Sequence, residues 1–130
     1  MTDSARDDRP PFPLAQGILR FTLEIVAVVS IGRGAFAYGG WPAVIIAVSA
    51  ALTIWTVFNV PGDPSRGGNA PVPVPGAVRL LVEALVFGAG TLGLWQTAGR
   101  AWALGFAAIT LAHYATTTPR LRFILRKRGG

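Results

Sequence analysis

The sequence predicts an all-α membrane protein of four transmembrane helices, arranged as two helical hairpins of the same orientation. Three observations predict this fold class. Hydrophobic residues make up 52% of the 130 residues and charged residues 14%, whereas an average soluble domain has about 25% charged residues. The hydrophobic residues form four long blocks, which a soluble chain of this length could not bury in one core. Segments rich in glycine and proline separate these blocks.

Each of the four blocks has the length of a helix that crosses a membrane. They cover about residues 18–38, 41–60, 78–97 and 101–118. About 20 helical residues cross a hydrocarbon core of roughly 30 Å. Lipid requires a helix here because it offers no partner to unpaired backbone groups, and the blocks lack the alternating polarity of a transmembrane barrel. We therefore expect one transmembrane domain over residues 14–118.

The segments between and beside the blocks predict two tight turns, one loop and two tails. Residues 39–42 and 98–100 are short enough for tight turns. Residues 61–75 contain five prolines, so we expect an extended, solvated cytoplasmic loop and not a helix. Residues 1–13 lack the compact apolar core of a signal peptide, and we expect a disordered cytoplasmic lead. Residues 119–130 are expected to form a basic cytoplasmic tail.

The distribution of positive charge predicts that both termini face the cytoplasm. With the N-terminus inside, ten of the twelve basic residues lie on the inner side, and only Arg33 and Arg100 lie on the outer side. This bias follows the positive-inside rule. Trp41, Trp95 and Trp102 lie near the two outer turns, where amphipathic rings favour the headgroup zone.

The basic tail predicts a contact with lipid headgroups. Five basic residues fall within the last eleven residues: Arg120, Arg122, Arg126, Lys127 and Arg128. Beside a membrane helix, such a run is expected to lie near anionic lipid. We expect no nucleic-acid partner, because no aromatic-rich or helix-turn-helix context accompanies the run. The absence of cysteine and the single histidine exclude a thiolate or multi-histidine metal site in one chain, and no cofactor is expected.

An internal repeat of about 59 residues is expected from the positions of scarce charged residues. A shift of 59 residues superimposes six identical pairs: Gly17/Gly76, Arg20/Arg79, Glu24/Glu83, Gly34/Gly93, Gly40/Gly99 and Leu52/Leu111. The arginine and glutamate pairs are the main evidence for the repeat, since chance matches of glycine and leucine are common. Two helices in each unit predict units of the same orientation, related by an axis along the membrane normal.

The repeated arginine and glutamate residues predict a buried polar network. Arg20 and Glu24, like Arg79 and Glu83, are four residues apart and share a helix face. Each carboxylate lies about 6 Å deeper than its arginine, where contact with lipid is costly. We therefore expect all four side chains to point into the bundle, with Arg20 able to reach Glu83 and Arg79 able to reach Glu24.

Two interpretations of this network remain open. In the structural one it fixes the register of the first and third helices, and breaking a pair costs about 3–5 kcal/mol. In the functional one, Glu24 and Glu83 bind a proton or cation on a transport path. The adjacent arginines neutralise the carboxylates and favour the structural interpretation. His113 is a secondary candidate, for a hydrogen bond between helices or for a proton relay.

Two segments resemble the YrdB-like family of small bacterial membrane proteins, which is defined by a domain of unknown function. They are Leu19-Arg20-Phe21-x-Leu23-Glu24 and Val78-Arg79-Leu80-Leu81-Val82-Glu83-x-Leu85-Val86-Phe87-Gly88. The resemblance covers about residues 14–118 and implies four helices in a bacterial plasma membrane, without an activity or catalytic residues.

The expected function is therefore a structural or interaction component of that membrane. No enzyme is expected, because the sequence offers no set of acid, base and nucleophile in a shaped site. Small residues on several helix faces permit close helix contacts, which leaves a homo-oligomer open. The alternative function is a small proton- or cation-coupled transporter that uses Glu24 and Glu83.

Overall fold

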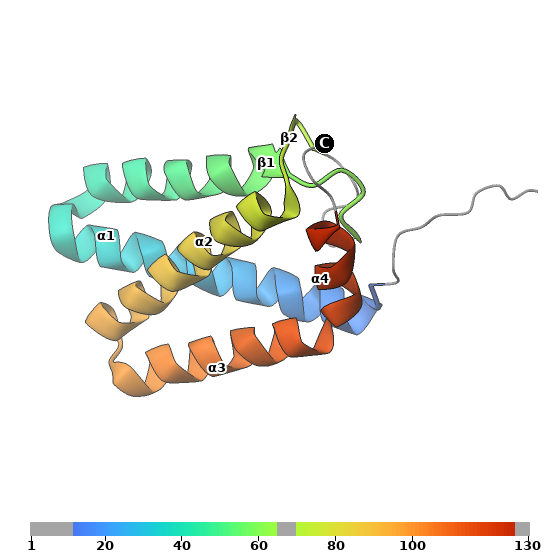
Figure 1. Ribbon diagram of the computed structural model, residues 1–130. Coiled ribbons are helices and arrows are strands. Elements are labelled where there is room, and N and C mark those ends of the chain that lie inside the picture. Colours follow the sequence, from blue (N-terminus) through green and yellow to red (C-terminus); the bar gives the residue numbers. More distant parts are fainter. Residues whose placement is uncertain (1–11, 65–69, 127–130) are drawn as a thin grey trace, which may run out of the picture.

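The structure is a computed structural model that describes residues 12–64 and 70–126. Within these ranges the chain forms four helices and one pair of short strands (Figure 1). The elements are α1 (Leu14–Val57), β1 (Phe58–Asn59), β2 (Val72–Pro73), α2 (Gly76–Thr97), α3 (Arg100–Thr116) and α4 (Thr118–Leu125). Most of the expected N-terminal lead, Arg66 in the loop and the end of the expected tail lie outside the described residues.

Helix α1 contains the first two predicted helices as two antiparallel arms, residues 14–38 and 41–57 (Figure 1). The arms join at Gly39 and Gly40, whose backbone angles are not helical. Gly40 has a φ of 68°, which glycine adopts without the penalty that a Cβ atom brings. Pro42 lies in the first turn of the second arm, where its missing N–H is tolerated. The second arm ends at Val57, three residues before the predicted end.

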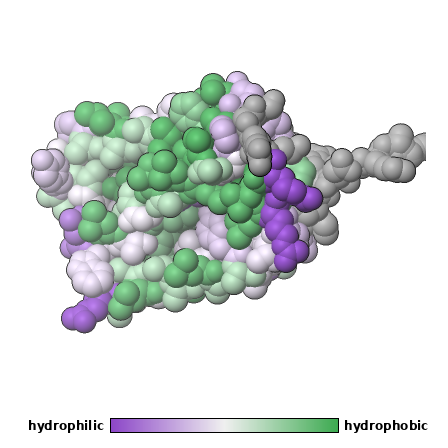
Figure 2. Space-filling view, in the orientation of Figure 1, coloured by the Kyte–Doolittle hydropathy of each residue, from purple (hydrophilic) through white to green (hydrophobic). Residues whose placement is uncertain are grey.

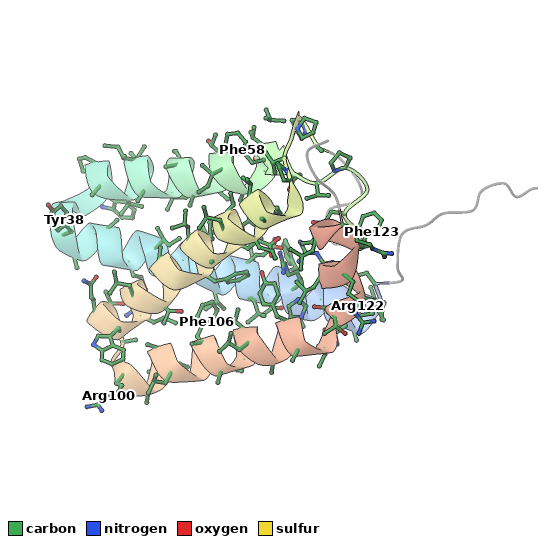
Figure 3. The ribbon with its side chains drawn as sticks, in the orientation of Figure 1. Tyr38, Phe58, Arg100, Phe106, Arg122 and Phe123 are labelled. Carbon is green, nitrogen blue, oxygen red and sulfur yellow. The ribbon has the colours of Figure 1, made fainter. Side chains whose placement is uncertain are left out.

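Helices α2 and α3 form a second hairpin, whose turn lies at the same end of the molecule as the turn of α1 (Figure 1). The backbone N–H groups of Ala98 and Gly99 both donate to the carbonyl of Leu94, which ends α2. Gly99 has a φ of 105°, so this turn, like the one at Gly40, uses a glycine with positive φ. Figure 3 shows Tyr38 and Arg100 at this end and Phe58 and Arg122 at the opposite end.

The first arm of α1 and helix α2 cross in direct backbone contact. A Cβ atom on Gly93 would lie 2.1 Å from the carbonyl oxygen of Ser30, and one on Gly90 would lie 2.9 Å from the Cα atom of Ala27. Small residues at such a crossing let two helices approach closely. The hydrophobic core continues between the helices with nine buried residues: Leu23, Ala27, Trp55, Val82, Val86, Phe87, Leu94, Ala103 and Phe106.

Two residues of the segment 61–75 depart from the expected solvated loop, while the other residues that the structure describes there are exposed or half-buried. Strands β1 and β2 pair in parallel, with Phe58 opposite Val72, so the segment folds back onto the bundle. Asp63 and Val74 are buried. The prolines keep the segment extended, as expected, but it packs against the helices because Asp63 has a buried partner there.

The first part of the expected basic tail, residues 119–130, forms a helix that packs on the bundle. Residues 118–125 form α4, which contacts the start of α2 and buries Phe123 and Ile124 together with Val60, the residue after β1. The contact is close, since a Cβ atom on Gly76 would lie 1.8 Å from the carbonyl oxygen of Ile124. Helix α3 ends at Thr116, two residues before the predicted end, and Pro119 lies in the first turn of α4.

Apolar side chains dominate the outside of the helices. Two helices, α1 and α2, are long and apolar enough to cross a membrane. In the most apolar 18-residue window of α1 only 11% of the residues are buried, and in that of α2 44% are. Figure 2 shows hydrophobic residues over the middle of one face and strongly hydrophilic ones towards its two ends.

Candidate functional site

A single carboxylate, that of Glu83 on α2, gathers three guanidinium groups. Glu83 is 1% exposed. Its Oε2 atom lies 2.8 Å from Nε of Arg79, 2.5 Å from Nη2 of Arg120 and 2.9 Å from Nη2 of Arg20. Its Oε1 atom accepts hydrogen bonds from Nη1 of Arg120 and from the hydroxyl of Tyr114. Residues of α1, α2, α3 and α4 therefore meet at one carboxylate.

The structure brings together the four residues of the predicted network. Within α1, Nε of Arg20 lies 3.1 Å from Oε2 of Glu24, and within α2 the pair Arg79–Glu83 repeats this spacing. Arg20 also reaches across to Glu83, one of the two cross-contacts that were expected. The two carboxylates differ in their surroundings, since Glu24 is 16% exposed and Glu83 almost completely buried.

Arg120 and Asp63 complete the site, and sequence reasoning missed both. Nε and Nη2 of Arg120 donate to the two carboxylate oxygens of Asp63 at 2.8 and 2.7 Å, the two-pronged geometry that favours arginine in buried ion pairs. Burial opposes the charge of Arg120, but the hydrogen bonds to Asp63 and the charge of Glu83 outweigh it, and the pKa of this guanidinium is raised.

The expectation that Arg120 contacts lipid headgroups is therefore wrong. Arg120, Phe123 and Ile124 are spaced three and four residues apart, so they share one face of α4, and all three are buried. Arg122 and Arg126 lie on the exposed face of this segment. The spacing of Arg120 to two large apolar residues was the signal in the sequence that could have placed it inside.

The site carries equal numbers of opposite charges. We call it the charge cluster, and it consists of Arg20, Glu24, Asp63, Arg79, Glu83 and Arg120. Buried charges are tolerated when they are paired and hydrogen-bonded. Three arginines and three carboxylates make the cluster neutral as a whole, with each of the arginines in contact with a carboxylate.

Aromatic rings enclose the arginines on the side that faces the core. The guanidinium carbon of Arg20 lies 5.2 Å from the ring centre of Trp55, 5.5 Å from that of Phe87 and 5.4 Å from that of Tyr114. These distances allow cation–π attraction. Arg79 lies over the ring of Trp55 and donates to the carbonyls of Trp55 and Phe58, so it also caps the end of the second arm of α1.

Comparison with known proteins gives the family of the chain. Residues 18–111 match the family described as "Protein of unknown function (DUF2568)". The chain belongs to this family. It is also 32% identical over 114 residues to "Uncharacterized protein YrdB" of Bacillus subtilis (strain 168), a match that covers 85% of this chain and 93% of that protein. These findings confirm the resemblance to the YrdB-like family, and no solved structure matches the chain.

The family match includes most of the charge cluster. Residues 18–111 contain five of its six members and end before Arg120. Tyr114, which donates to Glu83, also lies beyond the matched region. The part of the site that α4 supplies is therefore outside the segment by which the family is recognised.

His113 lies beside the charge cluster and has a different partner. Its Nδ1 atom is 3.1 Å from Oε1 of Gln16, which links α3 to the start of α1. The ring also contacts Phe12 and Tyr114 edge-on. The structure thus places His113 in a contact between two helices. Among the described residues, no group of three histidine, aspartate or glutamate side chains could hold a metal ion.

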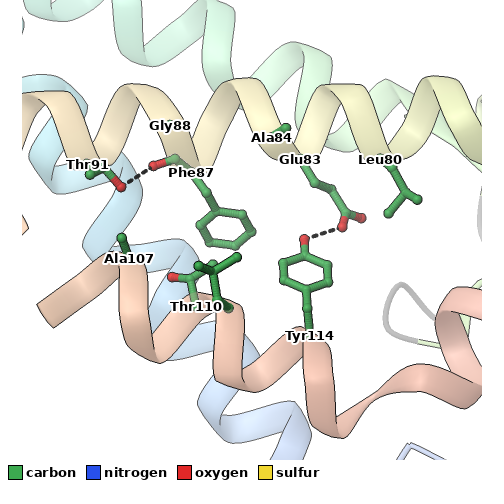
Figure 4. Close-up of a pocket in the computed structure, with 10 residues that line it drawn as sticks. Leu80, Glu83, Ala84, Phe87, Gly88, Thr91, Ala107, Thr110 and Tyr114 are labelled. Carbon is green, nitrogen blue, oxygen red and sulfur yellow. Dashed lines mark hydrogen bonds between the residues drawn. The ribbon is translucent and has the colours of Figure 1, made fainter. Parts of the chain in front are cut away.

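Two cavities border the charge cluster, one in each hairpin. A cavity of about 310 Å³ lies between α2 and α3, next to Glu83 and Tyr114 (Figure 4). A cavity of about 170 Å³ lies between the two arms of α1, next to Glu24 and Trp55. In both hairpins a glutamate and an aromatic residue therefore lie at the cavity wall.

Proposed function

We propose that this family member is an integral membrane protein of four transmembrane helices, whose charge cluster holds the cytoplasmic end of the bundle together. We propose that the protein has a structural role or binds partner proteins in the membrane, and that it is not an enzyme. The observation that carries the proposal is the distribution of polarity. Among the described residues, the largest fully buried side chains include Arg20, Arg79, Arg120, Glu83 and Asp63, while many large apolar side chains are exposed.

This distribution favours lipid over water around the helices. A soluble protein places most large apolar side chains inside and buries charges rarely, whereas charged residues in membrane segments face the bundle interior and pair with one another. Exposed apolar residues occur along all three long helices, for example Phe21, Ile45, Leu85, Trp102 and Ile109. A core helix of a soluble protein would be mostly buried, whereas only 11% of the most apolar 18-residue window of α1 is buried.

The helix lengths support four crossings. The arms of α1, residues 14–38 and 41–57, and helices α2 and α3 each have at least 17 residues, the lower end of the range for transmembrane helices. The two hairpin turns lie at one end, with Arg33 and Arg100 near them, and the charge cluster lies towards the other end. The positive-inside rule assigns the cluster end to the cytoplasm, and we place the chain in the bacterial plasma membrane.

The internal repeat gains support from equivalent positions with equivalent contacts. Trp55 and Tyr114 are 59 residues apart, and each ring contacts the repeated arginine of the other hairpin: Trp55 contacts Arg79, and Tyr114 contacts Arg20. Gly34 and Gly93, also paired by the shift, face one another, with an ideal Cβ of Gly34 at 3.1 Å from Cα of Gly93. We infer two related hairpins that pack around an axis between α1 and α2.

The geometry at Glu83 favours a structural role over transport. Three guanidinium groups and one hydroxyl surround this carboxylate, so its oxygens are already occupied and a cation would have to displace an arginine.

A proton- or cation-coupled transporter is the second candidate function, because Glu24 is partly exposed and lines the cavity between the arms of α1. Proteoliposomes should therefore show no proton or sodium flux above that of protein-free vesicles. Flux that Glu24→Gln abolishes would establish the transporter instead.

Sidedness can be measured because the sequence has no cysteine. We expect Ala37→Cys and Ala101→Cys, near the two turns, to react with a membrane-impermeant maleimide in intact cells. Ala15→Cys and Leu125→Cys, both exposed at the opposite end, should react only after permeabilisation. Equal labelling of all four variants in intact cells would refute the proposed topology.

A further inference from the structure

We propose that the cavity between α2 and α3 binds a neutral membrane amphiphile, an apolar chain or ring that carries one carbonyl or hydroxyl group. This inference rests on the proposed membrane position of the bundle. The cavity holds about 310 Å³, within the range of about 300–1,000 Å³ that is usual for small-molecule sites. We call it the α2–α3 cleft.

The α2–α3 cleft has apolar walls and opens at the outside of the helices. The residues at its rim, Ala84, Gly88 and Leu111, are exposed. A Cβ atom built on Gly88 would meet no atom within 4 Å, so the missing side chain leaves the rim open. In a membrane this opening faces lipid chains. The remaining apolar wall consists of Leu80, Phe87 and Ala107.

The hydroxyl group of Thr110, on the wall of the cleft, could form a hydrogen bond with a ligand. Thr110 is 6% exposed, and its Oγ1 atom has no hydrogen-bond partner in the described part of the chain. Thr91 and Tyr114, on the same wall, donate to the carbonyl of Phe87 and to Glu83. Figure 4 shows Thr110 projecting from α3 towards α2. Buried hydroxyl groups normally form a hydrogen bond. A carbonyl or hydroxyl oxygen of a ligand in the cleft would give the Thr110 hydroxyl its hydrogen-bond partner.

The charge cluster at the end of the cleft selects a neutral ligand. Glu83 lies on the cleft wall, but its oxygens are bound by three guanidinium groups and by Tyr114. The cluster is already neutral, so a charged headgroup would bring an unpaired charge into a buried site, which is costly. An ester, hydroxyl or ketone headgroup avoids this cost and can still form a hydrogen bond with the Thr110 hydroxyl.

The first hairpin shows which residues open the cleft. At the positions 59 residues before Ala84 and Gly88 stand Ile25 and Val29. The equivalent cavity beside Glu24 holds about 170 Å³, about half the volume of the cleft. The smaller residues of the second hairpin therefore enlarge its cavity, and larger ones should close it. Ala84→Ile with Gly88→Val gives the second hairpin the residues that the first already has.

A photoactivatable monoacylglycerol with a diazirine on its chain tests the proposal in proteoliposomes of the full chain. After irradiation, mass spectrometry should locate the adducts on residues that line the α2–α3 cleft. The double variant A84I/G88V should lower this labelling about tenfold or more, equivalent to about 1.4 kcal/mol. The matched control is Gly105→Val, because Gly105 is exposed on α3, has open space around it and lies outside the cleft. In this variant, labelling of the residues that line the cleft should be unchanged.

Thr110 gives a second readout that does not depend on filling the cleft. Thr110→Val keeps the shape but removes the hydroxyl, and it should lower labelling about tenfold, whereas Thr110→Ser should retain it. Adducts spread evenly over all exposed helix faces would overturn the proposal, as would equal labelling of the cleft by a fatty acid carrying the same diazirine. If alkaline carbonate extracts the chain from native membranes, the proposed function fails as well. If the chain stays in the membrane and the cleft is unlabelled, this inference alone fails.

Discussion

At the scale of the residue, the most constrained group is the carboxylate of Glu83. It contacts three arginines that are themselves buried, so removing its charge leaves three guanidinium groups with less compensation. Two carboxylates, those of Glu24 and Asp63, remain to balance them. The cost of losing one partner from a buried ion pair exceeds the value of the pair in an intact protein.

Glu83→Gln should therefore destabilise the protein by about 3–5 kcal/mol, measured by reversible denaturant or thermal unfolding in detergent. Glu24→Gln is the matched control, because it makes the same chemical change four residues after the arginine of the first hairpin. Since the Glu24 side chain is 16% exposed and that of Glu83 only 1%, the loss of the Glu24 charge should cost less. Equal effects of the two variants would contradict the central position of Glu83.

Arg120 and Asp63 should show strong energetic coupling. Arg120→Gln and Asp63→Asn each leave a buried charge with less compensation, whereas the double variant removes both charges. In a double-mutant cycle we expect a coupling energy of about 1–3 kcal/mol, again from unfolding in detergent. Arg122→Gln, on the exposed side of α4, should change stability by less than about 0.5 kcal/mol. Additive effects of the two cluster variants would show that α4 is not held by this pair.

The sequence predicted only part of this residue-scale picture. The spacing of Arg20 to Glu24 and of Arg79 to Glu83 places each pair on one helix face, which local geometry alone can indicate. The contacts of Arg120 with Asp63 and Glu83 join residues 57 and 37 positions apart. Such contacts depend on how α4 and the loop fold back, and no periodicity in the sequence encodes that.

At the scale of the element, close backbone crossings hold the helices together. The expected spans lie within a few residues of the observed helices, because long apolar blocks and glycine turns are strong local signals. Helix α4 was missed because a short segment with three arginines, Arg120, Arg122 and Arg126, has the composition of a tail. Its apolar residues Phe123 and Ile124 become a buried face only when the start of α2 lies against them.

Gly93→Ala should separate α2 from the first arm of α1, because its Cβ atom would lie 2.1 Å from the carbonyl oxygen of Ser30. We expect a loss of about 1–3 kcal/mol, the usual cost of overpacking, measured as a fall in Tm. Gly88→Ala is the control on the same helix, since its Cβ atom meets open space. It should leave Tm unchanged or raise it, because alanine favours helix over glycine. A fall in Tm for Gly88→Ala as large as that for Gly93→Ala would contradict the crossing.

At the scale of the whole molecule, a neutral charge cluster lies inside a bundle whose outer surface is largely apolar. The net charge of the chain is +6, and the arginines of the cluster are compensated, so the excess lies elsewhere. In the described residues, Arg122 and Arg126 extend from the cluster end and Arg33 and Arg100 from the turn end. We propose that Arg122 and Arg126, which are exposed, provide the contact with anionic headgroups that was expected of the tail.

The most direct test of this account is the behaviour of the full chain towards detergent. Membranes of cells that express it should retain the protein during alkaline carbonate washing. After extraction, size-exclusion chromatography should give a single species only while detergent is present, because the exposed apolar residues of α1, α2 and α3 need an apolar environment. A monodisperse protein in detergent-free buffer would contradict the membrane-embedded bundle.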